Sequence, residues 1–422
     1  MQRRIPRAQV MDRLNMGQSP QNVSIVPARL ASSHLLILWL GATFLGTVLI
    51  LSDLLQLDGV RLTQARLIVG RDFLNVWSGG RLAQDGQLAT LYDYQAYMAW
   101  QASIFGPLDP YNYSYPPHSL FLAMPFATLP YPLALAIWTL LGTAFFMWAA
   151  RAYIPDTLSL THAILTPAAI VNIWAGHYGF LIGGLWLLYF HYLDRFPGRS
   201  GAVAGLLTLK PHLGLLIALT MLLRKKIRPI LIACVVALSL IGLSILMFGG
   251  DLWRTWLVET SALQTRIMTA PGPKFYYFMM PSAYIALREA PASLAFMAQT
   301  GFAIAALALF WKARDARAQD LAFVSASATA VIMPYIFNYD LTVCSLGFAI
   351  LLFGRWETLT TWERAALWFA FAAPLLVMVF NPIGPLSLLA GLFVQASHAT
   401  GRNGEATPPM FGWQKWRGHA ST

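Results

Sequence analysis

Long apolar runs separated by short polar connections fill most of the chain. The apolar residues are grouped in runs rather than in the alternation that gives a soluble helix one polar face. A membrane-spanning helix needs about 17–25 largely apolar residues. On this basis we expect about twelve spans, at residues 35–56, 116–129, 131–150, 161–175, 177–193, 201–223, 229–248, 293–311, 321–337, 340–353, 364–380 and 385–399. The pattern therefore predicts an all-α polytopic membrane protein.

Two connections between the predicted spans are long, residues 57–115 and 249–292. The first contains two pieces with helical spacing and many aromatic residues, 72–84 and 91–104. Amphipathic, aromatic-rich helices so close to apolar runs are expected to lie flat at the membrane surface. No internal repeat divides the chain. We therefore expect one membrane domain over residues 35–399, between an N-terminal tail (1–34) and a C-terminal tail (400–422).

Composition supports this picture and excludes other classes of protein. Charged residues make up 11% of the chain, against about 25% in a soluble domain, and the mean hydropathy is +0.56. This excludes a cytosolic enzyme and a disulfide-stapled secreted domain. The net charge of +11 is spread over many connections, so it predicts no nucleic-acid partner.

The positions of Lys and Arg predict the orientation of the chain. Basic residues cluster at 224–228, 312–317 and 355–364, and such clusters favour the cytoplasmic side of a membrane. Both tails are then cytoplasmic, and the two long connections lie outside. In this topology His177, between two short predicted spans, falls on the inner side, away from any outer site.

Asp72 is the first candidate for chemistry, at the start of the piece 72–84. Asp is a favoured N-cap, so a purely structural role is one interpretation. The other is a carboxylate at the water–lipid boundary that accepts a proton from a hydroxyl group as a general base. One carboxylate oxygen is enough for a cap, so the two roles are compatible.

Lys210 and His212 flank Pro211 inside the predicted span 201–223. Lys210 lies close enough to the outer end for its side chain to reach the interface, which is the structural interpretation. Alternatively, Lys and His form a pair suited to an anionic phosphate, and the proline frees a backbone carbonyl. We give the phosphate interpretation slightly more weight.

Two further segments carry polar residues next to predicted spans. The first, residues 111–118, is rich in tyrosine and ends in Tyr115-Pro116-Pro117-His118. Its tyrosines suit the membrane interface, but aromatic rings such as Tyr115 also bind sugar faces, and His118 is a candidate for a phosphate contact. The second segment ends in Asp340, which either caps the next helix or belongs to a site.

The order of four short motifs resembles glycosyltransferase family 87. They are Asp-Phe-x-x-x-Trp from Asp72, Gly-x-x-x-x-Leu-Tyr from Gly86, Tyr-Pro-Pro from Tyr115 and Lys-Pro-His from Lys210. The resemblance extends over about residues 71–340. Members of this family are polytopic enzymes of the GT-C superfamily and include mannosyltransferases that use polyprenol-phosphate mannose.

The resemblance implies a GT-C-like bundle that moves a hexose, with mannose expected, from a polyprenyl-phosphate donor to a glycan or glycolipid acceptor. Transfer is inverting, needs no metal or other cofactor, and takes place on the outer side of the plasma membrane. Asp72 matches the family's first-loop acidic residue, its general base. Lys210, with His212 and Arg71 nearby, is expected to stabilise the phosphate leaving group. His212 stands where the family commonly has Gln, and Asp340 follows a tyrosine where the family often has His.

Two other classes of protein remain alternatives. A secondary transporter or lipid flippase also has about twelve spans, but usually shows two related halves, which this sequence lacks. A membrane scaffold without activity leaves Lys210 and Asp72 unexplained. We therefore prefer the glycosyltransferase hypothesis.

Overall fold

The computed structural model describes residues 28–401, except 271 and 273. Most of the two expected tails, 1–34 and 400–422, lies outside these residues. Within the described part the chain forms seventeen α-helices, and its β structure is limited to β1 (Leu57–Asp58), β2 (Arg61–Leu62) and β3 (Leu67–Ile68), which pair antiparallel in that order. The expected all-α class is therefore confirmed.

The α-helices vary widely in length. They are α1 (Ala28–Leu54), α2 (Phe73–Gln84), α3 (Tyr94–Phe105), α4 (Leu120–Ala127), α5 (Tyr131–Ala150), α6 (Pro167–Ala175), α7 (Gly179–Tyr192), α8 (Pro197–Leu206), α9 (Leu215–Leu223), α10 (Ile227–Phe248), α11 (Gly250–Thr269), α12 (Ala283–Ala286), α13 (Ala292–Ala313), α14 (Ala318–Ile332), α15 (Thr342–Gly354), α16 (Thr361–Val379) and α17 (Ile383–Ala399). The two helical pieces expected in the first long connection are α2 and α3.

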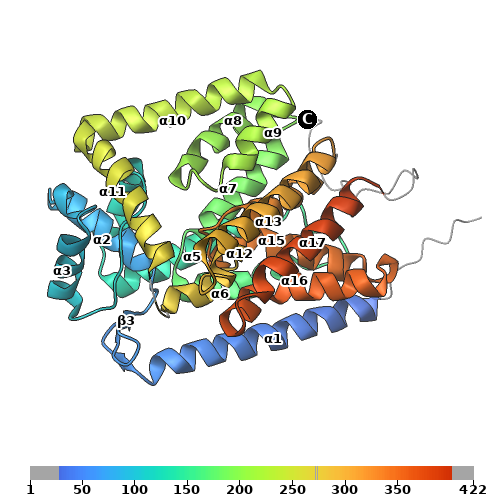
Figure 1. The fold of residues 1–422 in the computed structure, drawn as a ribbon, viewed down its shortest axis with the longest axis horizontal. Coiled ribbons are helices and arrows are strands. Elements are labelled where there is room, and N and C mark those ends of the chain that lie inside the picture. The colour runs from blue at the N-terminus through green and yellow to red at the C-terminus, as the bar shows by residue number, and fades with distance from the viewer. Residues whose placement is uncertain (1–27, 271, 273, 402–422) are drawn as a thin grey trace, which may run out of the picture.

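The bundle has two distinct ends (Figure 1). The short strands gather with α2, α3 and α11 at one end, which we call the loop end. The described chain begins and finishes at the other, which we call the tail end. There the connections between helices are tied together, since Arg224 donates hydrogen bonds to the backbone carbonyls of Arg314 and Ala316.

Five helices are long and apolar enough to cross a membrane: α1 from Ser33 onward, α5, α10, α13 and α16. Four shorter apolar helices accompany them, at Gly179–Tyr192, Ala318–Ile332, Asn338–Gly354 and Ile383–Ala399. These results agree with a polytopic membrane protein. They do not confirm the count of twelve spans.

Three of the predicted spans are not continuous helices. One of them, 161–175, contains only the nine-residue α6 after a 3₁₀ turn at Leu160–Ala163. The segment 116–129 contains only the eight-residue α4, about 12 Å long at 1.5 Å per residue, which is far short of a bilayer core. α4 packs on α2 instead, and the indole of Trp77 and the amide of Gln84 on α2 donate to the carbonyls of Leu129 and Met124. Hydropathy alone could not show that these apolar residues pack on α2 rather than face lipid.

The segment 201–223 is broken in the middle. α8 ends at Leu206 and α9 begins at Leu215, because Pro211 has no backbone N–H to continue a helix. The two helices fold back as a hairpin. At its tail end Asp194, which precedes α8, accepts from Lys226, just beyond α9, at 2.9 Å. The hairpin tip, residues 207–214, points towards the loop end and carries Lys210.

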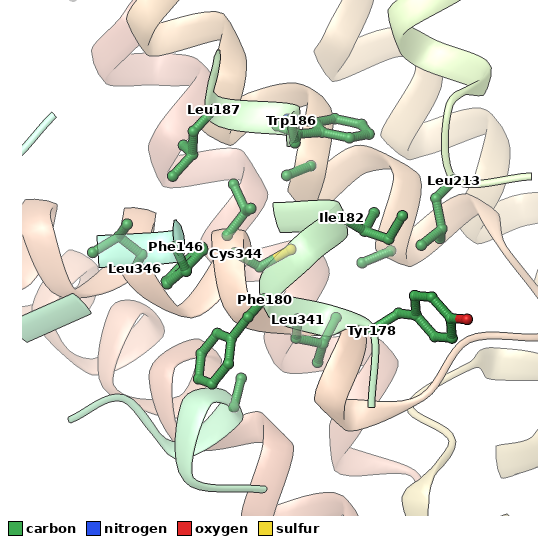
Figure 2. Packing of buried hydrophobic residues seen from close by; sticks show 14 of the residues in the cluster. Phe146, Tyr178, Phe180, Ile182, Trp186, Leu187, Leu213, Leu341, Cys344 and Leu346 are labelled. Atoms are coloured by element: carbon green, nitrogen blue, oxygen red, sulfur yellow. The ribbon is translucent and has the colours of Figure 1, made fainter. Parts of the chain in front are cut away.

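The core of the bundle centres on α7 and α15 (Figure 2). Nearly every residue of both helices is buried, including Trp186, whose indole donates to the Ala322 carbonyl at 2.9 Å. Gly183 allows the close approach, since a Cβ atom there would lie 2.7 Å from the Thr342 hydroxyl oxygen. The start of α7 is thereby fixed, and with it the position of His177 two residues before.

Candidate active site

A cavity of about 790 Å³ opens at the loop end of the bundle. Its volume suits a small-molecule site. Segments far apart in sequence supply its walls: the residues before and within α2, the stretch 109–116, the hairpin tip, α11 and the stretch 335–340. Six of the seven residues predicted for the site line it: Arg71, Asp72, Tyr115, Lys210, His212 and Asp340.

Lys210 and Asp340 form a buried ion pair in this cavity. The Lys210 ammonium donates to Asp340 Oδ1 at 2.7 Å, across 130 residues of sequence. The broken helix at Pro211 places Lys210 at the hairpin tip, and a short 3₁₀ turn, Asn338–Leu341, carries Asp340. Within the described residues this is the single hydrogen bond of the ammonium group, which leaves two of its three N–H donors for a ligand.

His177 belongs to the same cluster, contrary to the expectation that it lies away from the other predicted site residues. Its Nδ1 is 3.7 Å from Asp340 Oδ1, its Nε2 is 3.1 Å from the Tyr115 hydroxyl, and its ring stacks on Tyr339 with centroids 3.9 Å apart. The prediction was wrong because 116–129 is not a span, so α5 and α6 run in the opposite sense and bring His177 to the loop end.

Burial lowers the pKa of His177 well below its usual value, and the positive charge of Lys210 acts in the same direction. The imidazole in the loop between α6 and α7 is therefore neutral at pH 7. It contributes a hydrogen-bonding ring to the cavity wall rather than a second positive charge.

Asp72 directly precedes α2, but its side chain makes no capping hydrogen bond to that helix. The Tyr339 hydroxyl donates to its carboxylate instead. Burial raises the pKa of Asp72 to about 7, with the positive charge of Lys210 opposing this shift and the negative charge of Asp340 adding to it. A carboxyl group with such a pKa exchanges a proton readily near neutral pH.

A second buried ion pair joins Asp53, in the last turn of α1, to Arg71. Both terminal nitrogens of the guanidinium donate to the carboxylate, at 2.7 and 2.9 Å. The guanidinium carbon lies 3.3 Å from the ring centre of Trp174, whose indole N–H donates to Asp53 at 3.1 Å. Arg71 was predicted to contact a donor phosphate, but its two terminal nitrogens are already held by Asp53.

Comparison with known proteins gives one match. The model of glycosyltransferase family 87 matches residues 113–337, more than half of the chain. The chain belongs to glycosyltransferase family 87. No curated protein and no solved structure matches it. The matched region includes His177, Lys210 and His212 but neither Asp72 nor Asp340, which are assigned to the cavity by geometry.

His118 is the one predicted site residue that this glycosyltransferase does not bring to the cavity. Its ring is nearly parallel to that of Trp253, with centroids 5.6 Å apart, and its Nε2 lies 3.3 Å from the Thr208 hydroxyl. His118 therefore connects the start of α4 to α11 and the hairpin tip. The structure shows it in packing contacts rather than beside Asp72.

Sequence reasoning missed one wall of the cavity. α11 lies in the second long connection, and several of its residues, including Trp256 and Ile267, face the cavity. The Trp256 indole donates to the Ser114 carbonyl at 3.0 Å, which joins the two long connections. Residues 251–270 contain no Gly or Pro and carry two tryptophans among charged residues, so an amphipathic helix was predictable there.

Metal ligands were not predicted for this family 87 member. Among the residues that the structure describes, no group of three or more His, Cys, Asp or Glu side chains is arranged to hold a metal ion. The imidazole of His212 lines the same cavity as the Lys210–Asp340 pair.

Proposed function

We propose that this membrane glycosyltransferase moves a hexose, mannose in the first instance, from a polyprenyl-phosphate sugar to a hydroxyl group of a glycan or glycolipid. The observation that carries the proposal is the convergence of Asp72, Lys210, Asp340 and His177 on one cavity. A proton acceptor and a cation for a leaving phosphate thus share a space large enough for a sugar. The lipid-phosphate donor itself is an expectation from the family.

The reaction follows from these positions as a single displacement. Asp72 accepts the proton of the acceptor hydroxyl while that oxygen attacks the anomeric carbon of the donor sugar. The bond from the anomeric carbon to the phosphate oxygen breaks, and its electron pair leaves with the polyprenyl phosphate. One displacement inverts the configuration at the anomeric carbon.

The negative charge on the departing phosphate needs a fixed positive partner. Lys210 supplies it, with the two N–H donors that Asp340 does not use, and His212 provides a further donor at the hairpin tip. Arg71 is not required for this role. With the phosphate charge met by side chains, the proposed reaction has no step for a metal ion, and the lipid donor takes the place of a cofactor.

The distribution of charge supports a cavity on the outer side of the plasma membrane. In the described part of the chain the tail end holds thirteen basic residues: Arg29, Arg151, Arg195, Arg199, Arg224, Lys225, Lys226, Arg228, Lys312, Arg314, Arg317, Arg355 and Arg364. It holds six acidic ones: Asp156, Asp194, Asp315, Asp320, Glu357 and Glu363. Cytoplasmic connections carry such an excess of Lys and Arg. The corrected topology moves Arg151, Arg195 and Arg199 from the outer to the inner side and so strengthens this assignment.

The test is transfer by the purified full chain in lipid vesicles. Radiolabelled polyprenyl-phosphate mannose, glucose and arabinose are supplied separately with a mixture of glycan and glycolipid acceptors. We expect label in a product of inverted anomeric configuration from the mannose donor, in the presence of a chelator. Label from another donor alone would overturn the choice of sugar. Movement of a lipid-linked sugar across the vesicle membrane without any product would identify a flippase instead.

A further inference from the structure

The Asp53–Arg71–Trp174 cluster joins three segments that meet beside Asp72. Asp53 ends α1, Arg71 lies in the turn before α2, and Trp174 lies in the last turn of α6. The cluster contains three hydrogen bonds, two from Arg71 and one from Trp174, all to the Asp53 carboxylate. Arg71 is 5% exposed and Asp53 is 8% exposed. A bidentate pair with a stacked aromatic ring is the most rigid arrangement available to an arginine.

The turn before α2 needs such support because its backbone is unfavourable. Gly70 and Arg71 both have positive φ, +76° and +34°. Glycine adopts this region freely, whereas an arginine there is strained and keeps the conformation only if its surroundings hold it. The next residue is Asp72, whose backbone N–H donates to the Ala175 carbonyl at 3.0 Å. The conformation of Arg71 therefore decides where the Asp72 side chain points.

The same contacts also fix the other wall of the cavity. Trp174 lies three residues before His177, and the intervening Gly176 has φ +63°. A Cβ atom at Gly176 would be 2.7 Å from the Gly70 carbonyl oxygen, so the two turns are in direct contact. Any movement of the Arg71 turn relative to α6 would alter the spacing between Asp72 and the stack of His177 on Tyr339.

We propose that the Asp53–Arg71–Trp174 cluster is a clamp that positions Asp72 for proton transfer. Arg71 is then a positioning residue, and its positive charge is neutralised by Asp53 rather than by the donor phosphate. The clamp also connects the otherwise peripheral helix α1 to the reacting groups. This inference rests on the proposed function for its kinetic test.

The kinetic test compares Arg71→Lys with a matched control at the far end of α2. Lysine keeps the charge but cannot make the bidentate and stacked contacts. We expect kcat to fall about 10- to 100-fold with the donor KM unchanged, as for a small displacement of a reacting group. Trp174→Phe, which keeps the ring face, retains more activity than Trp174→Ala. Arg81→Lys alters only the exposed Arg81–Asp85 pair and leaves kcat unchanged.

Two kinetic outcomes contradict the clamp. A raised donor KM with unchanged kcat in Arg71→Lys would make Arg71 a phosphate contact. Unchanged kcat per folded molecule, with only a lower melting temperature, would make the cluster purely structural. Absence of transfer by the wild-type chain would instead refute the proposed function.

A second measurement does not depend on the reaction. Cys234 and Cys344 are replaced by Ser and Ala, Asp72→Cys is introduced, and the rate of its modification by a charged thiosulfonate is followed. We expect Arg71→Lys to change this rate at least about tenfold, and Arg81→Lys to leave it unchanged. Equal rates in the two backgrounds would overturn the clamp whatever the enzyme transfers.

Discussion

The two buried ion pairs near Asp72 differ in how firmly each holds its positively charged side chain. In the Asp53–Arg71 pair both terminal guanidinium nitrogens bind the carboxylate, and Trp174 covers the arginine. In the Lys210–Asp340 pair a single hydrogen bond of 2.7 Å joins the partners. We call the first the closed pair, because two bonds and a stacked ring fix the guanidinium, and the second the open pair, because one bond holds the ammonium.

We interpret this difference as a division of roles within one cavity: one ion pair maintains the backbone geometry, and the other binds the ligand. A planar guanidinium fixes geometry, whereas an ammonium group is a compact charge whose donors can turn towards a new partner. The closed pair lies at the strained turn before α2, where geometry has to be maintained. The open pair lies at the hairpin tip, in another part of the same cavity wall. Four experiments test this division, beginning with Asp72.

Asp72→Asn should have the largest effect, because it removes the proton acceptor and keeps the shape of the side chain. We expect the transfer rate to fall about 10³- to 10⁴-fold, at the upper range for loss of a general base. Membrane content and melting temperature should match the wild type. The measurement is label transfer from polyprenyl-phosphate mannose, and near wild-type transfer would show that Asp72 is not the base.

Asp53→Ala should affect stability most, because it leaves Arg71 buried without its partner. Loss of one partner of a buried pair costs about 3–5 kcal/mol. Asp53→Leu with Arg71→Met removes both charges, so the double variant should recover much of the melting temperature while transfer stays impaired. Thermal unfolding in detergent measures the first effect and label transfer the second. Full recovery of transfer in the double variant would argue against the clamp.

Lys210→Met should impair transfer per folded molecule, if the open pair serves the ligand, in addition to the stability that is lost when buried Asp340 is left without its partner. Removing one group that stabilises a developing charge costs about 10²- to 10³-fold in rate. Lys210→Arg keeps the positive charge and should therefore retain part of the transfer rate. A melting temperature reduced as much as in Asp53→Ala, with transfer per folded molecule unchanged, would show that both pairs are structural.

The pH profile should give the smallest effect and the sharpest distinction between the pairs. The pKa of Asp72 is raised to about 7, and a base acts only when deprotonated, so transfer should rise with pH through about 7. Lys210 opposes this raised pKa, so Lys210→Met should move the midpoint to higher pH. Arg71→Lys keeps the positive charge at position 71, so it should move the midpoint of the pH profile little. An unchanged midpoint in Lys210→Met would mean that a group other than Asp72 controls the pH profile.

The long apolar helices were predictable almost to the residue. The expected span 131–150 is α5, 229–248 corresponds to α10, and 293–311 corresponds to α13. Each is a continuous apolar run of bilayer length, so local sequence is sufficient to define it. The errors fell at 116–129, 161–175 and 201–223. The first segment packs on α2, the second contains only the nine-residue α6, and the third forms the two arms of a hairpin. An apolar run has the same hydropathy whether it faces lipid or protein.

The sequence predicted most residues of the candidate site, but it did not predict how they contact one another. Asp72 and Lys210 stood out because charged residues are scarce next to apolar runs. The role of Arg71 was not predictable, since its partner Asp53 lies 18 residues away at the end of a span and Trp174 more than 100 residues away. His177 was placed away from the site, because the false span at 116–129 inverts the predicted sense of the chain as far as the broken helix at 201–223, which restores it.

By itself the sequence determined the membrane class, most helix positions, the family and a short set of polar residues. These follow from hydropathy, chain-breaking prolines and motif order, which are properties of neighbouring residues. Tertiary structure decided which charges are paired and which remain open, and it brought His177 and α11 to the cavity. Pairing depends on distances between residues up to 130 positions apart, and in a bundle those distances are set by how helices pack.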